Sequence, residues 1–394
     1  MKVKGFLKDV GGASRVTKAR QKSWENASKE VVTRDPIGEV ARLLHPGRFE
    51  VTLIEKRDAS PTARTLRFSS STGHFPYFYA GQFLTLQTKI GDSLVTRPYS
   101  ISSSPEDTRG KDPFVEITVR KSKGDGFFCD YLYEEAKVGD KFLAEVGLGE
   151  FHVDLIRDAH DVVCLAGGSG ITPFLSMAKQ IKAGKLDVNL TILYGSVSEK
   201  DIILKDELEA CVCDKVKVVH VLSGDNPDWK GEKGFLSAEL IKKYSAKDTT
   251  YFICGPQVMY EFLHAELKKL KIPARRIRFE VFGQARDITK FEGFPKEKAD
   301  KTYQLTVVMG VHKETIPAKA NESILVALER HGIALHNSCR SGACGFCRCR
   351  VLEGETFVCP NNDGRRAADK DFGYFHACST YPLSDLTVRL PIAE

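Results

Sequence analysis

Four cysteines carry the clearest chemistry in this 394-residue sequence. Cys339, Cys344 and Cys347 follow one another as C-x4-C-x2-C in the run Cys-Arg-Ser-Gly-Ala-Cys-Gly-Phe-Cys, and Cys378 comes further downstream. This spacing is typical of plant-type [2Fe–2S] clusters, whose thiolates wrap two irons in a tight loop. A zinc site would more naturally show paired C-x2-C units. We therefore predict that these four thiolates ligate a [2Fe–2S] cluster. Two further cysteines nearby, Cys349 and Cys359, are expected to be packing residues.

A cluster moves one electron at a time, so the rest of the chain should show an electron source. The motif Arg97-Pro98-Tyr99-Ser100 ends a predicted strand. Its arginine suits a phosphate, its tyrosine the face of an isoalloxazine ring, and its serine a hydrogen bond near the reactive ring nitrogen. The alternative is a purely structural role, in which the motif is a strand end with a surface arginine and a core tyrosine.

A glycine turn downstream fits the same ligand. Gly126, Phe127 and Cys129 precede a predicted helix over Asp130–Glu135, whose first N–H groups suit a pyrophosphate.

A second glycine turn, Ala166-Gly-Gly168-Ser-Gly170-Ile-Thr172-Pro173, follows a predicted buried strand and opens a helix. Nucleotide pyrophosphates approach the backbone at such turns, although this one departs from G-x-G-x-x-G at Pro173. The run Cys254-Gly255-Pro256 ends a later strand, and Glu280-Val281-Phe282-Gly283 closes the region. A small polarisable thiol at Cys254 fits beside a nicotinamide ring, and a buried inert thiol is the alternative.

Composition narrows the class of protein. The length predicts two to four domains, and no apolar stretch reaches the roughly 18 residues of a membrane span. The first residues lack the apolar segment of a secretory signal, and eleven cysteines favour a reducing compartment, so we expect a cytoplasmic protein. Of the net charge of +6, residues 1–45 hold ten Lys/Arg against five Asp/Glu, so the basic excess lies on an arm. That distribution argues against a nucleic-acid-binding protein.

The hydrophobic pattern changes twice along the chain. Residues 1–34 read as a polar arm or frayed helix, and Asp35-Pro36 begins a short amphipathic helix that His45-Pro46-Gly47 ends. Its apolar face is expected to pack on the flavin domain or, less readily, on a partner or membrane surface. Short alternating strands then predict a small antiparallel barrel. Strand–helix–strand units after it predict a parallel sheet. A hairpin followed by a helix, with Asn321 as its cap, predicts a third domain. We assign a basic extension (1–46), a flavin-binding β-barrel (47–155), an α/β nucleotide domain (156–292), a charged linker (293–302) and a ferredoxin-like domain (303–394).

These ordered motifs over residues 48–394 resemble the ferredoxin–NADP reductase superfamily with a C-terminal plant-type ferredoxin domain of α+β, β-grasp fold. The resemblance implies that Arg97, Pro98, Tyr99, Ser100, Gly126, Phe127 and Cys129 bind the flavin. It implies that the nicotinamide cleft contains Gly168, Gly170, Thr172, Pro173, Cys254, Gly255 and Pro256. Cys254, Phe282 and Ser100 would lie at the hydride-transfer point. The family usually has Ser or Thr where Cys129 stands.

The sequence favours one nucleotide and one flavin without excluding the alternatives. No arginine follows the second predicted parallel strand to hold a 2′-phosphate, which favours NADH over NADPH, although Lys200 could serve. The glycine turn before Asp130 favours FAD over FMN.

The predicted function is an NAD(P)H oxidoreductase that passes electrons through flavin and cluster to a partner docking near the cluster, such as an oxygenase or another metalloenzyme. One alternative is an electron-transfer subunit that does not itself oxidise NADH, and another is a binding module with a structural cluster. Arg340, Arg348, Arg350, Arg365 and Arg366 are hypothesised to form a basic docking face, with scattered solvated arginines as the alternative.

Overall fold

The computed structural model describes residues 6–29, 34–44, 47–122, 124, 126–225, 227–283, 285 and 287–391. The chain divides into two units, residues 1–45 and 46–394. The first contains α1 (Phe6–Glu25) and α2 (Pro36–Leu44), and Ile37 and Val40 on α2 are exposed. Residues 1–34 thus contain a five-turn helix where an arm or frayed helix was expected, and α2 begins at Pro36 as predicted. His45 and Pro46, the predicted end of that helix, lie outside the described residues.

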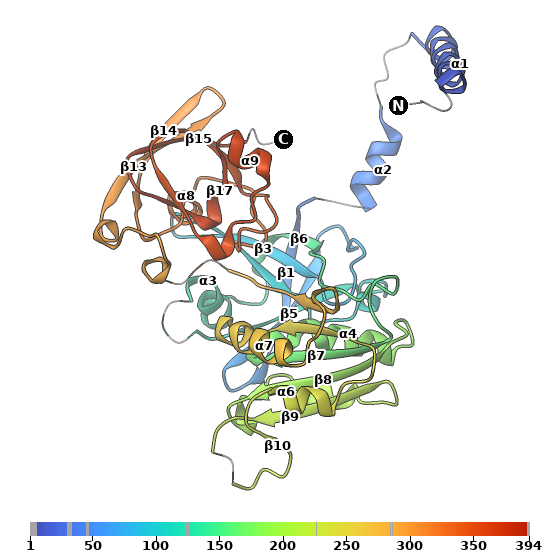
Figure 1. The fold of residues 1–394 in the computed structure, drawn as a ribbon, viewed down its shortest axis with the longest axis vertical. Helices are drawn as coiled ribbons and strands as arrows, with labels where there is room; N and C mark the ends of the chain where they lie inside the picture. Colours follow the sequence, from blue (N-terminus) through green and yellow to red (C-terminus); the bar gives the residue numbers. More distant parts are fainter. Residues whose placement is uncertain are drawn as a thin grey trace. The chain divides into compact units, whose positions relative to one another are not determined.

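The second unit begins with an antiparallel barrel. Six strands pair in the order β4-β3-β6-β1-β2-β5, and a bridge between Ile101 and Ile117 closes β4 onto β5. Alternate residues such as Val51, Leu53, Leu66 and Phe68 fill its interior. The strands are β1 (Phe49–Ser60), β2 (Ala63–Ser70), β3 (Phe83–Ile90), β4 (Ser93–Ser100), β5 (Phe114–Arg120) and β6 (Lys141–Leu148). The predicted barrel is confirmed (Figure 1).

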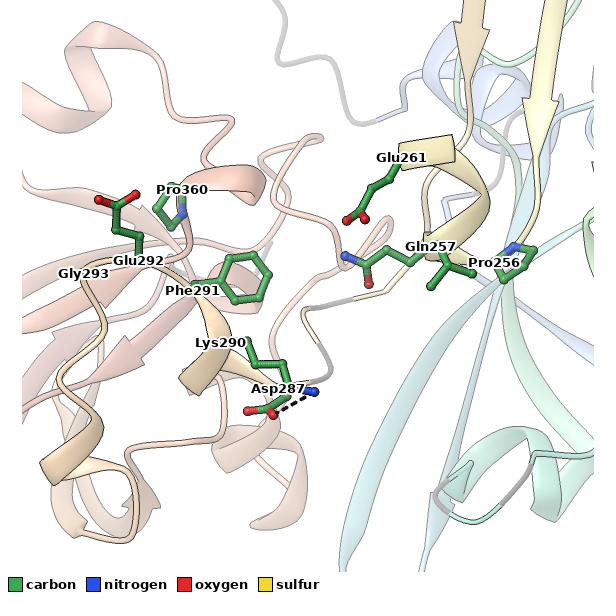
Figure 2. A pocket seen from close by; sticks show the side chains of 10 residues that line it. Pro256, Gln257, Glu261, Asp287, Lys290, Phe291, Glu292, Gly293 and Pro360 are labelled. Atoms are coloured by element: carbon green, nitrogen blue, oxygen red, sulfur yellow. Dashed lines mark ion pairs between the residues drawn. The ribbon is translucent and has the colours of Figure 1, made fainter. Parts of the chain in front are cut away.

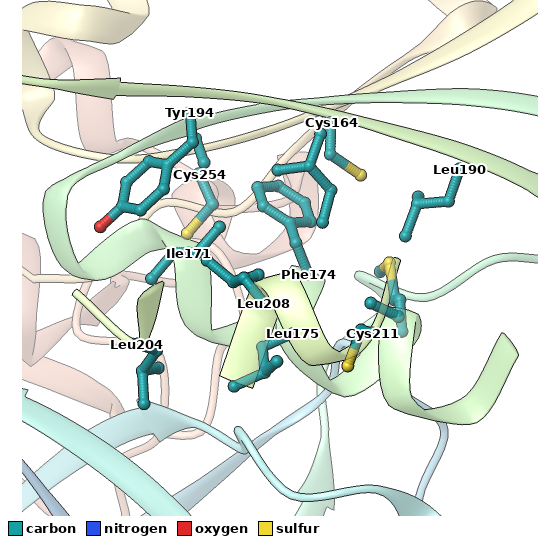
Figure 3. Close-up of a cluster of buried hydrophobic side chains, with 14 of the residues drawn as sticks. Cys164, Ile171, Phe174, Leu175, Leu190, Tyr194, Leu204, Leu208, Cys211 and Cys254 are labelled. Atoms are coloured by element: carbon teal, nitrogen blue, oxygen red, sulfur yellow. The ribbon is translucent and has the colours of Figure 1, made fainter. Parts of the chain in front are cut away.

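A doubly covered parallel sheet follows, with the strand order β10-β9-β8-β7-β11-β12. Its strands are β7 (Asp161–Gly167), β8 (Asn189–Ser196), β9 (Val216–Leu222), β10 (Glu232–Lys233), β11 (Thr249–Cys254) and β12 (Ile277–Phe279). The helices are α4 (Thr172–Lys182), α5 (Lys205–Ala210), α6 (Ala238–Lys243) and α7 (Gln257–Lys269). Figure 3 shows one packed face, where Phe174 and Leu175 of α4 meet Cys164 of β7. Side chains of α6 and α7 cover the other face.

The C-terminal part has a mixed sheet in the order β14-β13-β19-β15-β17, with α8 packed on it. Its elements are β13 (Thr302–Met309), β14 (His312–Lys319), α8 (Ile324–Arg330), β15 (Arg348–Glu353), α9 (Ala367–Asp371), β17 (Tyr374–His376) and β19 (Leu386–Arg389); β16 (Thr356–Val358) pairs with β18 (Thr380–Pro382). The cap of α8 is Ser323, whose hydroxyl accepts from the Val326 N–H, and not Asn321 as predicted. Ser323 is buried and lies three residues before Val326, the spacing that an N-cap side chain requires. The sequence pattern alone did not distinguish Ser323 from Asn321 as the cap.

The segment predicted as a charged linker is folded onto the C-terminal part. Phe294 is buried in a cluster with Ile288, Cys359 and Tyr381, and Lys296–Lys298 forms a 3-10 turn. Lys298 also donates to the Leu383 carbonyl. The charged residues therefore lie on the outside of an apolar contact.

Candidate redox site

The end of β4 and the end of the parallel sheet meet at one place. Ser100 pairs with Phe83 on the neighbouring strand β3, and the ring of Phe282 lies 4.9 Å from that of Phe83. The Ser100 hydroxyl donates to Glu280 at 3.3 Å. These contacts bring the predicted flavin serine and the Glu280-Val281-Phe282 motif together.

The two predicted nicotinamide turns are in direct contact. A Cβ at Gly170 would lie 2.2 Å from the Cys254 carbonyl oxygen, and one at Gly167 would lie 2.5 Å from the sulfur of Met259 on α7. At Gly170 the close atom belongs to the backbone, so only glycine fits there, and the turn after β7 packs against the turn after β11. Thr172 is buried and donates to the Ser169 carbonyl, and Pro173 occupies the first turn of α4.

Cys254 ends β11 among Ile171, Phe174 and Tyr194 (Figure 3). Burial, followed by the nearby Glu280, raises the pKa of its thiol well above the ordinary value. Cys254 is therefore a neutral thiol at neutral pH and not a thiolate nucleophile.

Glu280 and Tyr260 belong to this site and were not among the predicted site residues. Burial raises the pKa of the Glu280 carboxyl well above its usual range, opposed by its hydrogen bond with Ser100. The Tyr260 hydroxyl accepts from the Gly255 N–H at 3.2 Å and donates to the Glu280 carbonyl, so it joins the two strand ends. The acid directly before Val281-Phe282 was a usable signal for Glu280; a tyrosine on α7 gave none.

The remaining predicted flavin residues lie along β4 and the turn before α3 (Phe127–Asp130). Tyr99 is half-buried, with its ring 6.1 Å from Phe128. A Cβ at Gly126 would lie 2.4 Å from the Cys129 sulfur, and that thiol donates to the Gly126 carbonyl at 3.2 Å. The predicted helix over Asp130–Glu135 is instead α3 followed by a π-helical turn at Tyr131–Glu135. Phe127 is 53% exposed and thus free to meet a ligand.

Arg97 does not extend freely from the barrel. Its Nη1 donates to both carboxylate oxygens of Glu329 on α8 at 3.0 Å and to the Thr96 carbonyl. Among the described residues, its Nε and Nη2 atoms make no hydrogen bond, so that side of the guanidinium remains available for an anion.

The four predicted ligand cysteines lie together as two pairs. Hydrogen bonding between Cys339 and Cys344 lowers the pKa of the first thiol and raises that of the second, and the same relation holds for Cys347 and Cys378. In the described part of the chain no three His, Cys, Asp or Glu side chains converge to hold one metal ion. Two pairs of thiols suit a two-iron cluster, in which each iron takes two protein ligands.

Backbone N–H groups point at these sulfurs. Ser341 and Cys344 donate to Cys339 at 3.4 Å, and Gly342 donates to Cys378 at 3.2 Å. Gly342 has φ +78, and a Cβ there would lie 1.9 Å from the Asn362 carbonyl oxygen. Four thiols with amide donors form a donor set that fits a [2Fe–2S] cluster.

The hypothesised basic docking face is wrong in part. Arg340 is only 3% exposed and its Nη1 is bound to Glu329 at 2.6 Å. Arg348 pairs with Asp369, and Arg365 is held by both oxygens of Asp363. Arg340 is therefore not part of an exposed face, and Arg348 and Arg365 are paired with local carboxylates, whereas Arg350 is exposed.

A pocket of about 790 Å³ adjoins the Cys254-Gly255-Pro256 turn (Figure 2). Pro256, Gln257 and Glu261 line it on one side, and Phe291 and Pro360 on the other. Its described lining carries three carboxylates and a single lysine, Lys290, which pairs with Asp287. The carboxylates of Glu261, Asp287 and Glu292 therefore do not favour a dinucleotide pyrophosphate in this pocket.

Comparisons with known proteins agree with this geometry. Three family models match the chain: an oxidoreductase FAD-binding domain over residues 50–153, an oxidoreductase NAD-binding domain over 164–265 and a 2Fe-2S iron-sulfur cluster binding domain over 308–383. The 3-ketosteroid-9-alpha-monooxygenase ferredoxin reductase component of Mycobacterium tuberculosis is 29% identical over 90% of this chain and 97% of its own. The glycine betaine monooxygenase reductase subunit of Chromohalobacter salexigens is 25% identical over 87% of this chain and 95% of its own. Among solved structures, phthalate dioxygenase reductase matches with a TM-score of 0.63 at 22% identity, over 88% of this chain and 98% of its own.

Fold, motifs and comparisons together define an NAD(P)H-dependent oxidoreductase with FAD-, NAD- and [2Fe–2S]-binding domains. The order of these three domains along the chain agrees with the resemblance seen in the sequence. Within the described residues, no helix has both the length and the apolar character needed to cross a membrane.

Proposed function

We propose that this chain is the NADH-oxidising reductase component of a multicomponent oxygenase, and that it delivers single electrons from its cluster to a separate metalloenzyme. The observation that carries the proposal is a backbone hydrogen bond from the Gly283 N–H to the carbonyl of the ligand residue Cys339, at 3.3 Å. The loop that closes the hydride-transfer site therefore touches the cluster loop. Relatives named as monooxygenase reductase components over nearly their whole length support the same role.

The proposed roles of the site residues follow from their contacts. Arg97, Pro98, Tyr99 and Ser100 hold the flavin, with Gly126, Phe127 and Cys129 at its phosphates. Gly168, Gly170, Thr172, Pro173, Gly255 and Pro256 form the nucleotide cleft, with Cys254 beside the nicotinamide and Phe282 over the flavin face. When bound, the flavin accepts a hydride, which carries two electrons, from reduced nicotinamide and releases the electrons singly to the cluster held by Cys339, Cys344, Cys347 and Cys378.

NADH is the proposed donor. Beyond β8, Asp201 accepts a hydrogen bond from Ser198 and lies 3.6 Å from Arg120, so Arg120 is already paired. A 2′-phosphate would meet the carboxylates of Glu199 and Asp201. We also propose a cytoplasmic location, because none of the eleven cysteines forms a disulfide in the described structure.

The test is an anaerobic absorbance titration of the holoprotein with NADH and, separately, NADPH, followed by EPR of the reduced sample. Bleaching of flavin and cluster bands by NADH with a one-electron cluster signal is the expected result. Bleaching by NADPH alone would overturn the donor. No bleaching by either would favour the alternative, a subunit that receives its electrons from another protein. Adding a purified oxygenase component and following reoxidation of the cluster tests delivery.

A further inference from the structure

Glu329 joins the flavin motif to the cluster loop. This carboxylate lies on α8, is 6% exposed, and accepts from Arg97 at 3.0 Å and from Arg340 at 2.6 Å. It also accepts from the Thr96 N–H at 3.3 Å. Helix α8 packs against β4, the strand that ends in Arg97-Pro98-Tyr99-Ser100. A single side chain therefore binds both halves of the junction.

The two arginines that it binds are placed for different cofactors. Arg340 directly follows Cys339, has φ +57, and is almost fully buried. A non-glycine residue in the left-handed region is unfavourable, so this conformation requires support from its surroundings. The salt bridge with Glu329 supplies that support. Arg97 gives one nitrogen to Glu329 and keeps the rest of its guanidinium free toward the flavin site.

The Glu329 carboxylate balances the positive charges of Arg97 and Arg340. Two buried or half-buried guanidiniums face each other here, and among the described residues Glu329 is the acid that contacts both. Removing one partner from a buried charge network leaves the other charges uncompensated. The free-energy cost of this loss is larger than the net stabilisation that the intact network provides. Without Glu329, the arginines would repel each other and separate the cluster loop from β4.

We propose that Glu329 is a positioning residue that fixes the cluster loop relative to the flavin-binding strand and so sets the rate of intramolecular electron transfer from flavin to cluster. This inference rests on the proposed function. Electron transfer depends steeply on the separation of the two redox groups, so a small displacement of the loop has a large kinetic effect. Hydride transfer takes place at Ser100, Cys254 and Phe282, which Glu329 does not contact.

The experiment compares three variants with the native holoprotein. Glu329→Gln removes the charge, and Glu329→Asp keeps it on a shorter side chain. Glu322→Gln is the matched control, because Glu322 lies just before α8 and binds Arg330 at 2.7 Å without touching the flavin domain. Anaerobic stopped-flow spectroscopy follows flavin bleaching and then cluster bleaching after mixing with NADH. Cluster content and EPR are recorded for each variant.

We expect flavin reduction in flavin-saturated Glu329→Gln to stay near the native rate, while cluster reduction slows by about tenfold or more. Glu329→Asp should recover part of that loss, and Glu322→Gln should behave as native. Amide hydrogen exchange in residues 96–100 and 339–344 should accelerate in Glu329→Gln only. If Glu329→Gln does not fold, the intermediate rate of Glu329→Asp is the deciding measurement.

A native rate of cluster reduction in both Glu329 variants, or an equal loss in Glu322→Gln, would overturn the proposal. The proposed function fails separately, when NADH does not reduce the flavin of the native protein at all.

Discussion

The Ser100 hydroxyl and the Glu280 carboxylate lie 3.3 Å apart, although 180 positions separate them in the chain. Ser100 ends β4 of the flavin barrel, and Glu280 directly follows β12, the edge strand of the nucleotide sheet. Their hydrogen bond fixes one domain against the other where the flavin and nicotinamide are proposed to meet.

The first prediction concerns pH and this pair. Because burial raises the pKa of Glu280, the carboxyl stays protonated above its usual range and becomes charged only as pH rises further. We expect NADH-dependent flavin reduction to fall by about tenfold per pH unit once Glu280 ionises. Glu280→Gln, which mimics the protonated form and can still accept from Ser100, should remove that fall. Stopped-flow rates between pH 6 and 10, as an approximate range, test this, and an identical pH profile in both proteins would contradict it.

The same titration affects stability. A carboxyl whose pKa is raised in the folded state contributes stability that is fully present below its unfolded pKa and is lost as pH rises through the folded pKa. Thermal unfolding of native protein and Glu280→Gln should therefore diverge as pH rises above the unfolded value of 4.5, with the variant relatively more stable at the higher pH.

The second prediction concerns the cluster. Cys378→Ser should lose most of its iron, the cluster absorbance and the EPR signal, while NADH still bleaches the flavin. Cys349→Ala is the control, because Cys349 is buried beside Cys347, with its thiol directed at the Cys347 carbonyl at 3.7 Å. Iron content near two per chain in Cys349→Ala is expected. Retained cluster in Cys378→Ser, or iron loss in Cys349→Ala alone, would show that the ligand set is wrong.

The third prediction concerns Glu116, which is 2% exposed and binds Arg57 at 2.6 Å and Arg67 at 2.8 Å. Lys179 of the nucleotide domain lies 3.8 Å away. Burial alone would raise the pKa of Glu116, but these cations keep it below its usual value of 4.5. Its stabilisation is present above that unfolded value and is lost as pH falls through the lower folded pKa.

Glu116→Gln should therefore reduce the free energy of unfolding by about 2 kcal/mol at neutral pH, a figure discounted because the arginines are partly exposed. The deficit should shrink in acid. Denaturant titrations at two pH values measure it, and Glu50→Gln, which breaks an exposed pair with Lys141 on the same barrel, should cost little. A deficit that does not change with pH would contradict the assignment.

The fourth prediction concerns Tyr260, whose hydroxyl bridges Gly255 and Glu280. Tyr260→Phe leaves the Gly255 N–H without its partner and should cost about 1 kcal/mol of stability. We expect a several-fold rise in KM for NADH with a smaller change in kcat. Tyr251→Phe removes a hydroxyl that binds Ser245 at the opposite end of the same sheet, so steady-state kinetics of that variant should match native.

Much of this architecture could be predicted from local patterns. Alternation in residues 49–56 and 114–120 revealed barrel strands, and continuous apolar runs revealed β7, β8 and β11, because each pattern reflects burial on one or both faces. The cysteine spacing located the cluster loop for a similar reason, since its ligands lie mostly within nine residues.

Contacts between distant segments could not be predicted. Glu329 looks like an ordinary charged position at the end of an amphipathic helix, and Arg340 like a surface cation. Only the packing of α8 against β4 buries both. Phe294 was hidden in the same way, because its charged neighbours suggested a solvated segment.

That buried Phe294 has a kinetic consequence. The segment before β13 is anchored to the C-terminal domain because Ile288 and Phe294 pack with Cys359 and Tyr381. The domain therefore stays attached to its electron source instead of having to find it by diffusion. Electron transfer from the flavin to the cluster is then a first-order step, and its rate does not depend on protein concentration. The encounter with the acceptor, in contrast, depends on protein concentration. At saturating NADH, dilution of the system should therefore slow reduction of the acceptor but not reduction of the cluster.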